Sequence, residues 1–310
     1  MATAQSVMTM PMWRLRLEAL RLQILIATSK RWRHRGPGIR GAFSAAWRNI
    51  AQGITMPIMS FWSCNFGVLF SIWAFLRIID EYVDGALNLP EGVTIEHYLA
   101  RKRNLINAYR EGRLPGLEIA REDRLLLFAL RECSRRGVDI IPDLLTQLYW
   151  FSFDAKRRGS GKATTKAILD HCAFDLEFTI VRFAAQILGG DMPLVEKICK
   201  ALNGLLQELD WLKDVIEDLE QGYINISSEA GIDLRKLSCA RTWEELWAVP
   251  GFTAWHKEEV LRIASEWWKV KNLLKPALRR IIPQYWARVL FHCWLNEQRK
   301  KLDELILLHI

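Results

Sequence analysis

The chain has 310 residues, of which half are hydrophobic, a quarter are charged and only 10 are proline. This composition excludes a disordered or fibrous protein, and the length is sufficient to bury a large core. Lysine and arginine outnumber aspartate and glutamate by 43 to 35, which gives a formal net charge of +8. Such a charge indicates an anionic partner. A phosphorylated metabolite, an acidic membrane surface and a nucleic acid are the candidates.

Much of the basic excess lies near the N-terminus. Between Trp13 and Arg48 there are nine arginine and lysine residues against one acid, Glu18, and apolar residues are interleaved with them. A solvated basic arm and contact with a membrane surface both explain this pattern. No groove-reading motif follows, so we do not expect nucleic acid as a partner. We assign residues 1–50 to a basic arm with a first helix, and residues 51–310 to one all-α domain.

Three features address the compartment. The six cysteines are scattered and form no Cys-x-x-Cys pair, which favours a reduced, cytoplasmic compartment over a metal or redox motif. The N-terminus lacks an apolar run followed by a cleavage site, so we expect no signal peptide. The uncharged run Met56–Phe75 has the length of a membrane span, but polar residues interrupt it and it leads directly into charged residues. It therefore predicts a buried core helix, with an integral membrane protein as the alternative.

Apolar residues recur at helical spacing along almost the whole chain, and no alternating strand pattern of useful length appears. The expected helices are 14–27, 59–82, 95–110, 122–135, 142–156, 164–188, 192–219, 243–247, 257–273 and 276–308. Glycine-rich and proline-containing stretches separate most of them. Several of these helices exceed 20 residues, which favours a single-domain, all-α helical bundle around a central cavity.

Two acid-rich segments interrupt these apolar helices. They are the first acidic segment, residues 80–84, and the second acidic segment, residues 210–218. Asp80 and Asp84 are four residues apart, as are Asp214 and Asp218, so each pair is expected on one face of a helix, one turn apart. Like charges placed in this way repel each other, and a bound divalent cation would cancel the repulsion. An ordinary charged helix face would explain either segment alone, whereas the two together favour a site.

The chemistry of these side chains suits Mg²⁺, which takes hard oxygen ligands and is typically shared between carboxylates and substrate phosphates. Two carboxylate pairs facing each other across a cavity would hold Mg²⁺ around a diphosphate and neutralise it as it leaves. Arg77 lies three residues before Asp80, and Lys213 adjoins Asp214. Both cations can hydrogen-bond diphosphate oxygens. The sequence therefore predicts Mg²⁺ as the cofactor.

Both acidic segments resemble known motifs. Ser60-Phe61-Trp62 together with residues 73–84 resembles the first aspartate-rich region of the squalene/phytoene synthase family, in which a Ser-Phe-aromatic element precedes a helix ending in Arg-x-x-Asp-Asp-x-x-Asp. Residues 207–222 resemble the second region, Gln-x-x-Asn-x-x-Arg-Asp-x-x-Glu-Asp-x-x-x-Gly-Arg. His171-Cys172 stands where a helix of the family begins with Tyr-Cys. The resemblance covers roughly residues 58–222.

The resemblance implies the isoprenoid synthase bundle and a reaction that begins with Mg²⁺-assisted ionisation of an allylic prenyl diphosphate. The metal ligands that it implies are Asp80, Asp84, Asp214, Glu217 and Asp218. The residues expected to contact the diphosphate are Ser60, Arg77, Gln207 and Lys213. Because this family typically joins two prenyl diphosphates head to head, we expect a head-to-head prenyl transferase.

The chain departs from the family pattern at three places. Trp73 and His171 replace tyrosines: Trp73 can stabilise a carbocation through its π face, and His171 can handle a proton. Leu176-Glu177 replaces small residues, which would narrow the cavity. Asp175 and Glu177 point to different faces of the expected helix, so at most one of them lines a site.

These departures keep alternatives open. On the same fold they support a terpene cyclase or a prenyl transferase with a single donor. From a different class, a catalytically silent, membrane-associated assembly protein remains an alternative. The sequence leaves the prenyl chain length, the number of substrates and the oligomeric state open.

Overall fold

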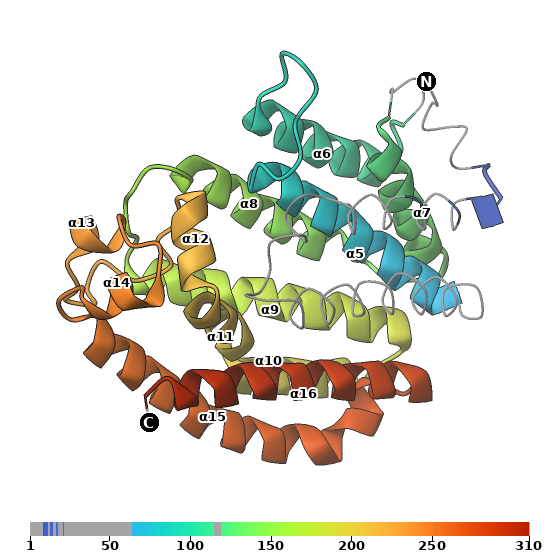
Figure 1. The fold of residues 1–310 in the computed structure, drawn as a ribbon. Helices are drawn as coiled ribbons and strands as arrows, with labels where there is room; N and C mark the ends of the chain where they lie inside the picture. The colour runs from blue at the N-terminus through green and yellow to red at the C-terminus, as the bar shows by residue number, and fades with distance from the viewer. Residues whose placement is uncertain are drawn as a thin grey trace. The chain divides into compact units, whose positions relative to one another are not determined.

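The computed structural model describes residues 9–11, 13–14, 17, 21, 64–114 and 119–309. These residues form twelve helices, α5 to α16, and none of them lies in a strand (Figure 1). The all-α prediction is therefore confirmed. The chain divides into two compact units, residues 1–155 and 156–310, which we describe one at a time. Most of the predicted basic arm lies outside the described residues, and its boundary at residue 50 stays a prediction.

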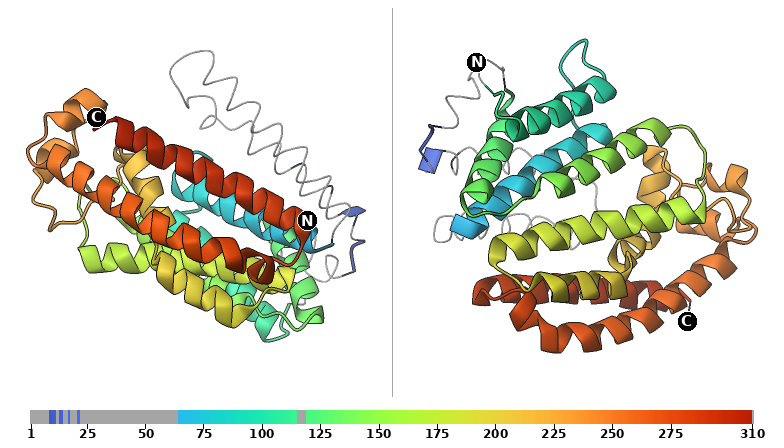
Figure 2. Two further views of the ribbon diagram at one scale, coloured as in Figure 1. Left: turned by 90° about the horizontal axis from the view of Figure 1, so that it is seen from below. Right: turned by 180° about the vertical axis from the view of Figure 1, so that it is seen from behind.

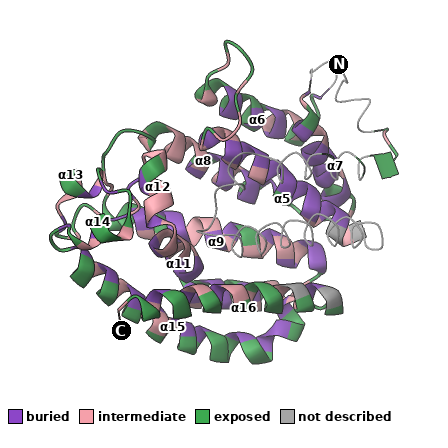
Figure 3. Cartoon of the chain, viewed as in Figure 1, coloured by how far each residue is buried: buried purple, intermediate pink, exposed green. Residues whose placement is uncertain are grey.

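The first unit contains four helices in the described part. They are α5 (Cys64–Val83), α6 (Ile95–Arg110), α7 (Arg121–Arg135) and α8 (Ile141–Arg157), the last of which ends just inside the second unit. Helix α5 packs mainly against α7 and also contacts α6. Phe70, Ala74 and Ile78 of α5 form a core cluster with Leu125 of α7. Figure 3 shows the resulting band of buried residues along both helices.

Helix α5 is apolar nearly all round because it is enclosed. Val68, Phe75 and Ile79 lie on one side of the helix and have no exposed surface, and Phe70 (2%) and Ala74 (0%) on the opposite side are buried as well. The prediction of a core helix is thus confirmed for residues 64–75, while residues 56–63 lie outside the described part. Within the described residues, no helix combines the length and the apolar character that crossing a bilayer requires.

The second unit contains eight helices, two of which are short turns (Figure 2). They are α9 (Lys166–Leu188), α10 (Met192–Leu202), α11 (Leu205–Lys213), α12 (Val215–Gln221), α13 (Leu234–Leu237), α14 (Trp243–Trp247), α15 (Phe252–Ile281) and α16 (Tyr285–Leu307). Helix α9 packs on α10 and α11, and α15 packs on α10, α11, α14 and α16. One core cluster joins these long helices, and a second lies under α12, α13 and α14.

The single helix expected over residues 192–219 is wrong, because three helices occupy this stretch. The first break is at Asn203 and Gly204, which both have positive φ (48° and 82°). A Cβ on Gly204 would lie 2.7 Å from the Cβ of Ala173 in α9, so this close helix crossing requires glycine. The second break is at Asp214, where α11 ends and α12 begins.

The expected boundary between residues 273 and 276 is also wrong. Helix α15 continues through Pro276 and ends at Ile281. Proline removes one backbone hydrogen bond from the helix interior, but Leu274, Ala277 and Leu278 on either side of it are buried in the core. Packing therefore holds the helix together where local propensity predicts an end.

Candidate functional site

The first acidic segment closes α5, and Arg77 organises it from the preceding turn. The Arg77 guanidinium donates to Asp80 Oδ2 at 2.5 Å and to Glu81 Oε1 at 2.7 Å. Glu81 is fully buried, whereas Asp80 and Asp84 are partly exposed. The Asp84 N–H donates to the Asp80 carbonyl at 2.8 Å, so the two aspartates follow each other by one helical turn as expected.

A buried polar network lies next to this segment in the first unit, and sequence reasoning missed it. The Tyr82 ring packs on the Tyr98 ring with 4.8 Å between centroids, and the Tyr98 hydroxyl donates to Glu122 at 2.9 Å. Lys102 Nζ lies 2.6 Å from both Glu122 Oε1 and Asp123 Oδ1. Burial alone would raise the pKa of Glu122, but Lys102 outweighs it and the pKa is lowered. Burial and Glu122 raise the pKa of Tyr98.

The second acidic segment lies on α11 and α12 in the second unit. The backbone keeps winding through the break, because the Asp214 N–H donates to the Asp210 carbonyl and the Asp218 N–H to the Asp214 carbonyl. Asp214 and Asp218 therefore follow each other by one turn, as predicted. Helix α16 adds residues from far along the chain: Lys301 pairs with Asp210, and Glu304 lies 3.8 Å from Lys213.

Asp218 has a neutral partner. The Asn225 amide donates to Asp218 Oδ2 at 2.7 Å, and the Arg157 guanidinium in turn donates to the Asn225 amide oxygen. The pKa of the Asp218 carboxyl lies well above its usual range, because burial raises it and the neighbouring Asp214 and Glu217 raise it further, against the Asn225 hydrogen bond. Three carboxyl groups thus share about one turn of chain, and the Arg157 guanidinium offsets part of their effect on the pKa of Asp218.

Glu177 and Asp175 point to different faces of α9, as expected. Glu177 is buried, and its Oε2 accepts from the Leu206 N–H at 2.9 Å at the start of α11. Burial raises its pKa to about 8, and Glu208 and Asp210 add to this against the backbone hydrogen bonds. Its carboxyl caps a helix that begins with Gly204 and therefore has no side-chain cap of its own. Glu177 thus has a structural role in the fold.

The remaining predicted site residues fall in different surroundings. His171 is exposed, and its Nε2 lies 3.0 Å from Asp175 Oδ2 one turn along α9. Trp73 on α5 is 38% exposed and stacks with Phe70 at 6.1 Å between ring centroids. Gln207 lies in α11 beside the start of the second segment. Ser60 lies outside the described residues.

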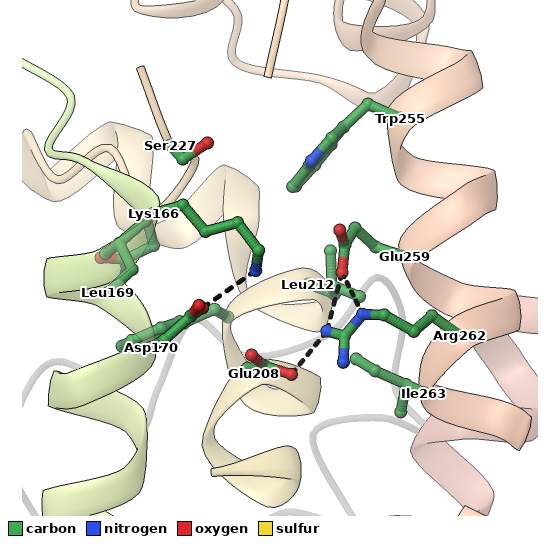
Figure 4. A pocket seen from close by; sticks show the side chains of 12 residues that line it. Lys166, Leu169, Asp170, Glu208, Leu212, Ser227, Trp255, Glu259, Arg262 and Ile263 are labelled. Carbon is green, nitrogen blue, oxygen red and sulfur yellow. Dashed lines mark hydrogen bonds and ion pairs between the residues drawn. The ribbon is translucent and has the colours of Figure 1, made fainter. Parts of the chain in front are cut away.

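A small, open pocket with a volume of about 50 Å³ lies in the second unit beside the second acidic segment. Its apolar walls are Leu169, Trp211, Leu212, Trp255 and Ile263, and its polar lining is Lys166, Asp170, Glu208, Asn225, Ser227, Glu259 and Arg262. Figure 4 shows Arg262 reaching Glu208 at 2.5 Å and Glu259 at 2.8 Å, with Lys166 on Asp170 at 2.9 Å. Because its charges pair with one another, the lining itself selects neither an anion nor a cation.

The donor chemistry of both segments fits Mg²⁺, with a limit on the number of ligands. Carboxylate oxygens are the hard ligands that Mg²⁺ prefers, and one or two of them suffice when substrate phosphates complete the coordination. Within the described residues, no three or more Asp, Glu, His or Cys side chains converge on a metal position. Each segment by itself therefore offers one or two carboxylates, and the convergence of the two segments stays a prediction.

Comparison with known proteins adds no relative. No family model matches the chain, and no curated protein or solved structure matches it either.

Proposed function

We propose that the protein is an Mg²⁺-dependent isoprenoid enzyme that ionises allylic prenyl diphosphates, in the manner of a head-to-head prenyl transferase. One observation carries the proposal: each acidic segment sets part-buried aspartates one helical turn apart beside a basic side chain. Arg77 accompanies Asp80 in the first segment, and Lys213 adjoins Asp214 in the second. Such an arrangement suits a metal-bound diphosphate, which needs carboxylates for the metal and cations for the phosphate oxygens.

The proposed roles follow from the chemistry of each side chain. Asp80, Asp84, Asp214 and Asp218, with Glu217, would hold Mg²⁺, which supplies charge neutralisation for the departing diphosphate. Arg77 and Lys213 would donate to diphosphate oxygens, with Gln207 and Ser60 as further contacts. The exposed face of Trp73 would stabilise a carbocation, and His171, held by Asp175, would accept or return a proton.

The test is pyrophosphate release from farnesyl and geranylgeranyl diphosphate in the presence of Mg²⁺. We expect release by the wild-type protein, and a loss of about a hundredfold or more in Asp80→Asn and in Asp214→Asn, since each removes a metal-binding charge at nearly constant shape. Asp303→Asn is the matched control, because Asp303 is exposed on α16 and pairs only with Arg299 among the described residues. Equal turnover in all three variants would contradict the metal assignment.

Product mass then separates coupling from cyclisation. A doubled carbon count indicates a head-to-head prenyl transferase, and an unchanged count indicates a terpene cyclase.

A non-catalytic assembly protein is the second candidate, and one observation favours it. Arg77 already binds both Asp80 and Glu81, and Asn225 already binds Asp218, so an acid of each segment has a partner without a ligand. On this hypothesis the acids stabilise the fold. No prenyl chain length then yields pyrophosphate, and the Asp80→Asn variant loses stability instead of turnover.

A further inference from the structure

Helix α15 has an outer side that its packing role does not explain. Its inner face, from Val260 to Ile281, is buried against the core of the second unit. Away from this face it carries three large apolar side chains that are about half exposed: Leu261 (56%), Trp268 (57%) and Leu273 (44%). Leu261 and Trp268 lie on the same side of the helix, whereas Leu273 lies about 140° from Trp268 around the axis.

The same helix is strongly basic. After Glu266 it contains five basic residues and no acidic one: Lys269, Lys271, Lys275, Arg279 and Arg280. Lys269 pairs with Glu266, and Arg280 pairs with Asp191 of the neighbouring helix start. Lys275 and Arg279 are exposed, so their charges face solvent.

Apolar and basic side chains share one line along the helix. Leu261, Trp268 and Lys275 are spaced seven residues apart, and Arg279 follows after one more turn. At 3.6 residues per turn, these four side chains lie within about 20° of Trp268 around the helix axis, over a length of about 27 Å. Figure 3 shows the exposed residues along this outer side of α15. We call Leu261, Trp268, Lys275 and Arg279 the α15 outer face.

From this arrangement we propose that the α15 outer face docks the protein onto a membrane surface that contains anionic lipids. Tryptophan prefers the level of the lipid headgroups, and basic side chains near an anionic surface each add to binding. Lys271 Nζ lies 4.9 Å from the centroid of the Trp268 ring, so a further basic group stands next to the tryptophan. Charge complementarity and the tryptophan together select lipid over a purely polyanionic partner.

This mode of binding is peripheral. The inner face of α15 is committed to the protein core, so the helix lies on the surface and does not insert as a separate amphipathic segment. The proposal is independent of the proposed catalytic function, because it uses none of the residues in the two acidic segments.

Vesicle flotation of the full chain tests the proposal. We expect the wild-type protein to float with vesicles of phosphatidylcholine mixed with phosphatidylglycerol, and not with phosphatidylcholine alone. Lys275→Glu/Arg279→Glu should weaken binding about tenfold or more, because it removes the attraction to anionic lipids. Trp268→Ser should weaken binding about fivefold, because it removes the ring that lies at the level of the headgroups. Every variant keeps the N-terminal arm, so any contribution of that arm is constant across the series.

Two control variants test whether any loss of binding is specific to the α15 outer face. One reverses two charges elsewhere, and the other removes an exposed aromatic ring elsewhere. Lys197→Glu/Lys200→Glu on α10 changes the charge by the same amount at two exposed positions, and Tyr149→Ser on α8 removes an equally exposed aromatic ring. Both should bind like the wild type. Circular dichroism and thermal unfolding verify that every variant is folded.

Three results would overturn the proposal: equal losses in the α10 control, equal flotation with neutral vesicles, or unchanged flotation in both α15 variants. In a parallel titration with single-stranded polyuridylate, binding that depends on Lys275 and Arg279 but not on Trp268, without flotation, would identify RNA as the partner of this face and exclude the lipid proposal.

Discussion

Carboxyl groups that are wholly or partly buried have different hydrogen-bond donors in the two units. In the first unit three of them contact cations: Glu122 and Asp123 accept from Lys102, and Glu81 accepts from Arg77. In the second unit Glu177 accepts from a backbone N–H and Asp218 from an amide. The pKa is lowered for Glu122 by Lys102, whereas burial raises it for Glu177 and Asp218 against their hydrogen bonds. Burial also raises the pKa of Glu208, although Arg262 donates to that carboxyl.

This difference has a consequence for function. Glu81, Glu122 and Asp123 of the first unit accept directly from cations, whereas Asp218 accepts from an amide and is repelled by Asp214 and Glu217. A metal-binding role is thus easier to reconcile with the second acidic segment than with the first, where Mg²⁺ would have to displace Arg77 from Asp80. The following predictions test the contrast, beginning with the largest expected effect.

Replacing Lys102 with methionine should cause the largest loss. It leaves Glu122 and Asp123 buried without their cation, which costs about 3–5 kcal/mol of the free energy of unfolding at neutral pH. A lowered carboxyl pKa contributes stability that is present above the unfolded value of 4.5 and lost as the pH falls through the folded pKa. The loss caused by Lys102→Met should therefore shrink in acid.

Urea unfolding measured at several pH values checks this, with Arg101→Met on the exposed side of α6 as the control. A loss below about 1 kcal/mol for Lys102→Met, similar to that of the control, would show that the network is solvated and would remove the contrast.

Glu177→Gln should alter how stability depends on pH. Because the pKa of Glu177 is about 8 in the folded protein against 4.5 in the unfolded chain, the unfolded chain releases its proton first as the pH rises. Wild-type stability from this group is fully present below pH 4.5 and falls between the two values. The substituted glutamine does not titrate yet keeps an acceptor for the Leu206 N–H, so at about pH 8 the variant should be more stable than the wild type by about 4 kcal/mol.

The measurement is the free energy of unfolding across this pH range, with Glu196→Gln at an exposed position of α10 as the control. The same pH slope in Glu177→Gln as in the wild type would mean that the carboxyl is ionised in the folded protein.

Tyr98→Phe should have an intermediate effect. It removes the hydroxyl that donates to Glu122 at 2.9 Å and keeps the ring that packs on Tyr82, so we expect a loss of about 1–2 kcal/mol. Thermal unfolding compares it with Tyr109→Phe, which removes an exposed hydrogen bond to Ser134 and should change stability little. A larger loss of stability in Tyr109→Phe than in Tyr98→Phe would show that the Tyr98–Glu122 hydrogen bond contributes little to stability.

The sequence predicts what local pattern determines. The helix expected over 95–110 is α6, because its apolar spacing is regular and Thr94 caps its start. The contacts of Arg77 with Asp80 and Glu81 also lie within one turn, although the sequence indicates only their proximity. Periodicity and capping depend on residues a few positions apart, so they can be predicted from the sequence alone.

What the sequence does not predict depends on distant contacts. The break at Gly204 follows from its approach to Ala173, and the continuation through Pro276 follows from core packing on both sides of it. In the candidate site, Lys301 pairs with Asp210, which lies 91 residues earlier in the sequence. No local sequence pattern predicts this ion pair. Asn225 is the exception, because its position just after the Gly222 turn could have suggested contact with Asp218.

The smallest loss of unfolding free energy is expected from replacing Arg262. This prediction compares a partly exposed cation of the second unit with the buried Lys102 of the first. Arg262 does touch two acids of the second unit, Glu208 and Glu259, but its side chain is 39% exposed at the edge of the pocket. Arg262→Met should therefore cost only about 0.5–1 kcal/mol in urea unfolding, close to the value for the exposed pair broken by Lys269→Met. A loss as large as that of Lys102→Met would show that the pocket is dry in solution, and that the second unit also compensates its acids with buried cations.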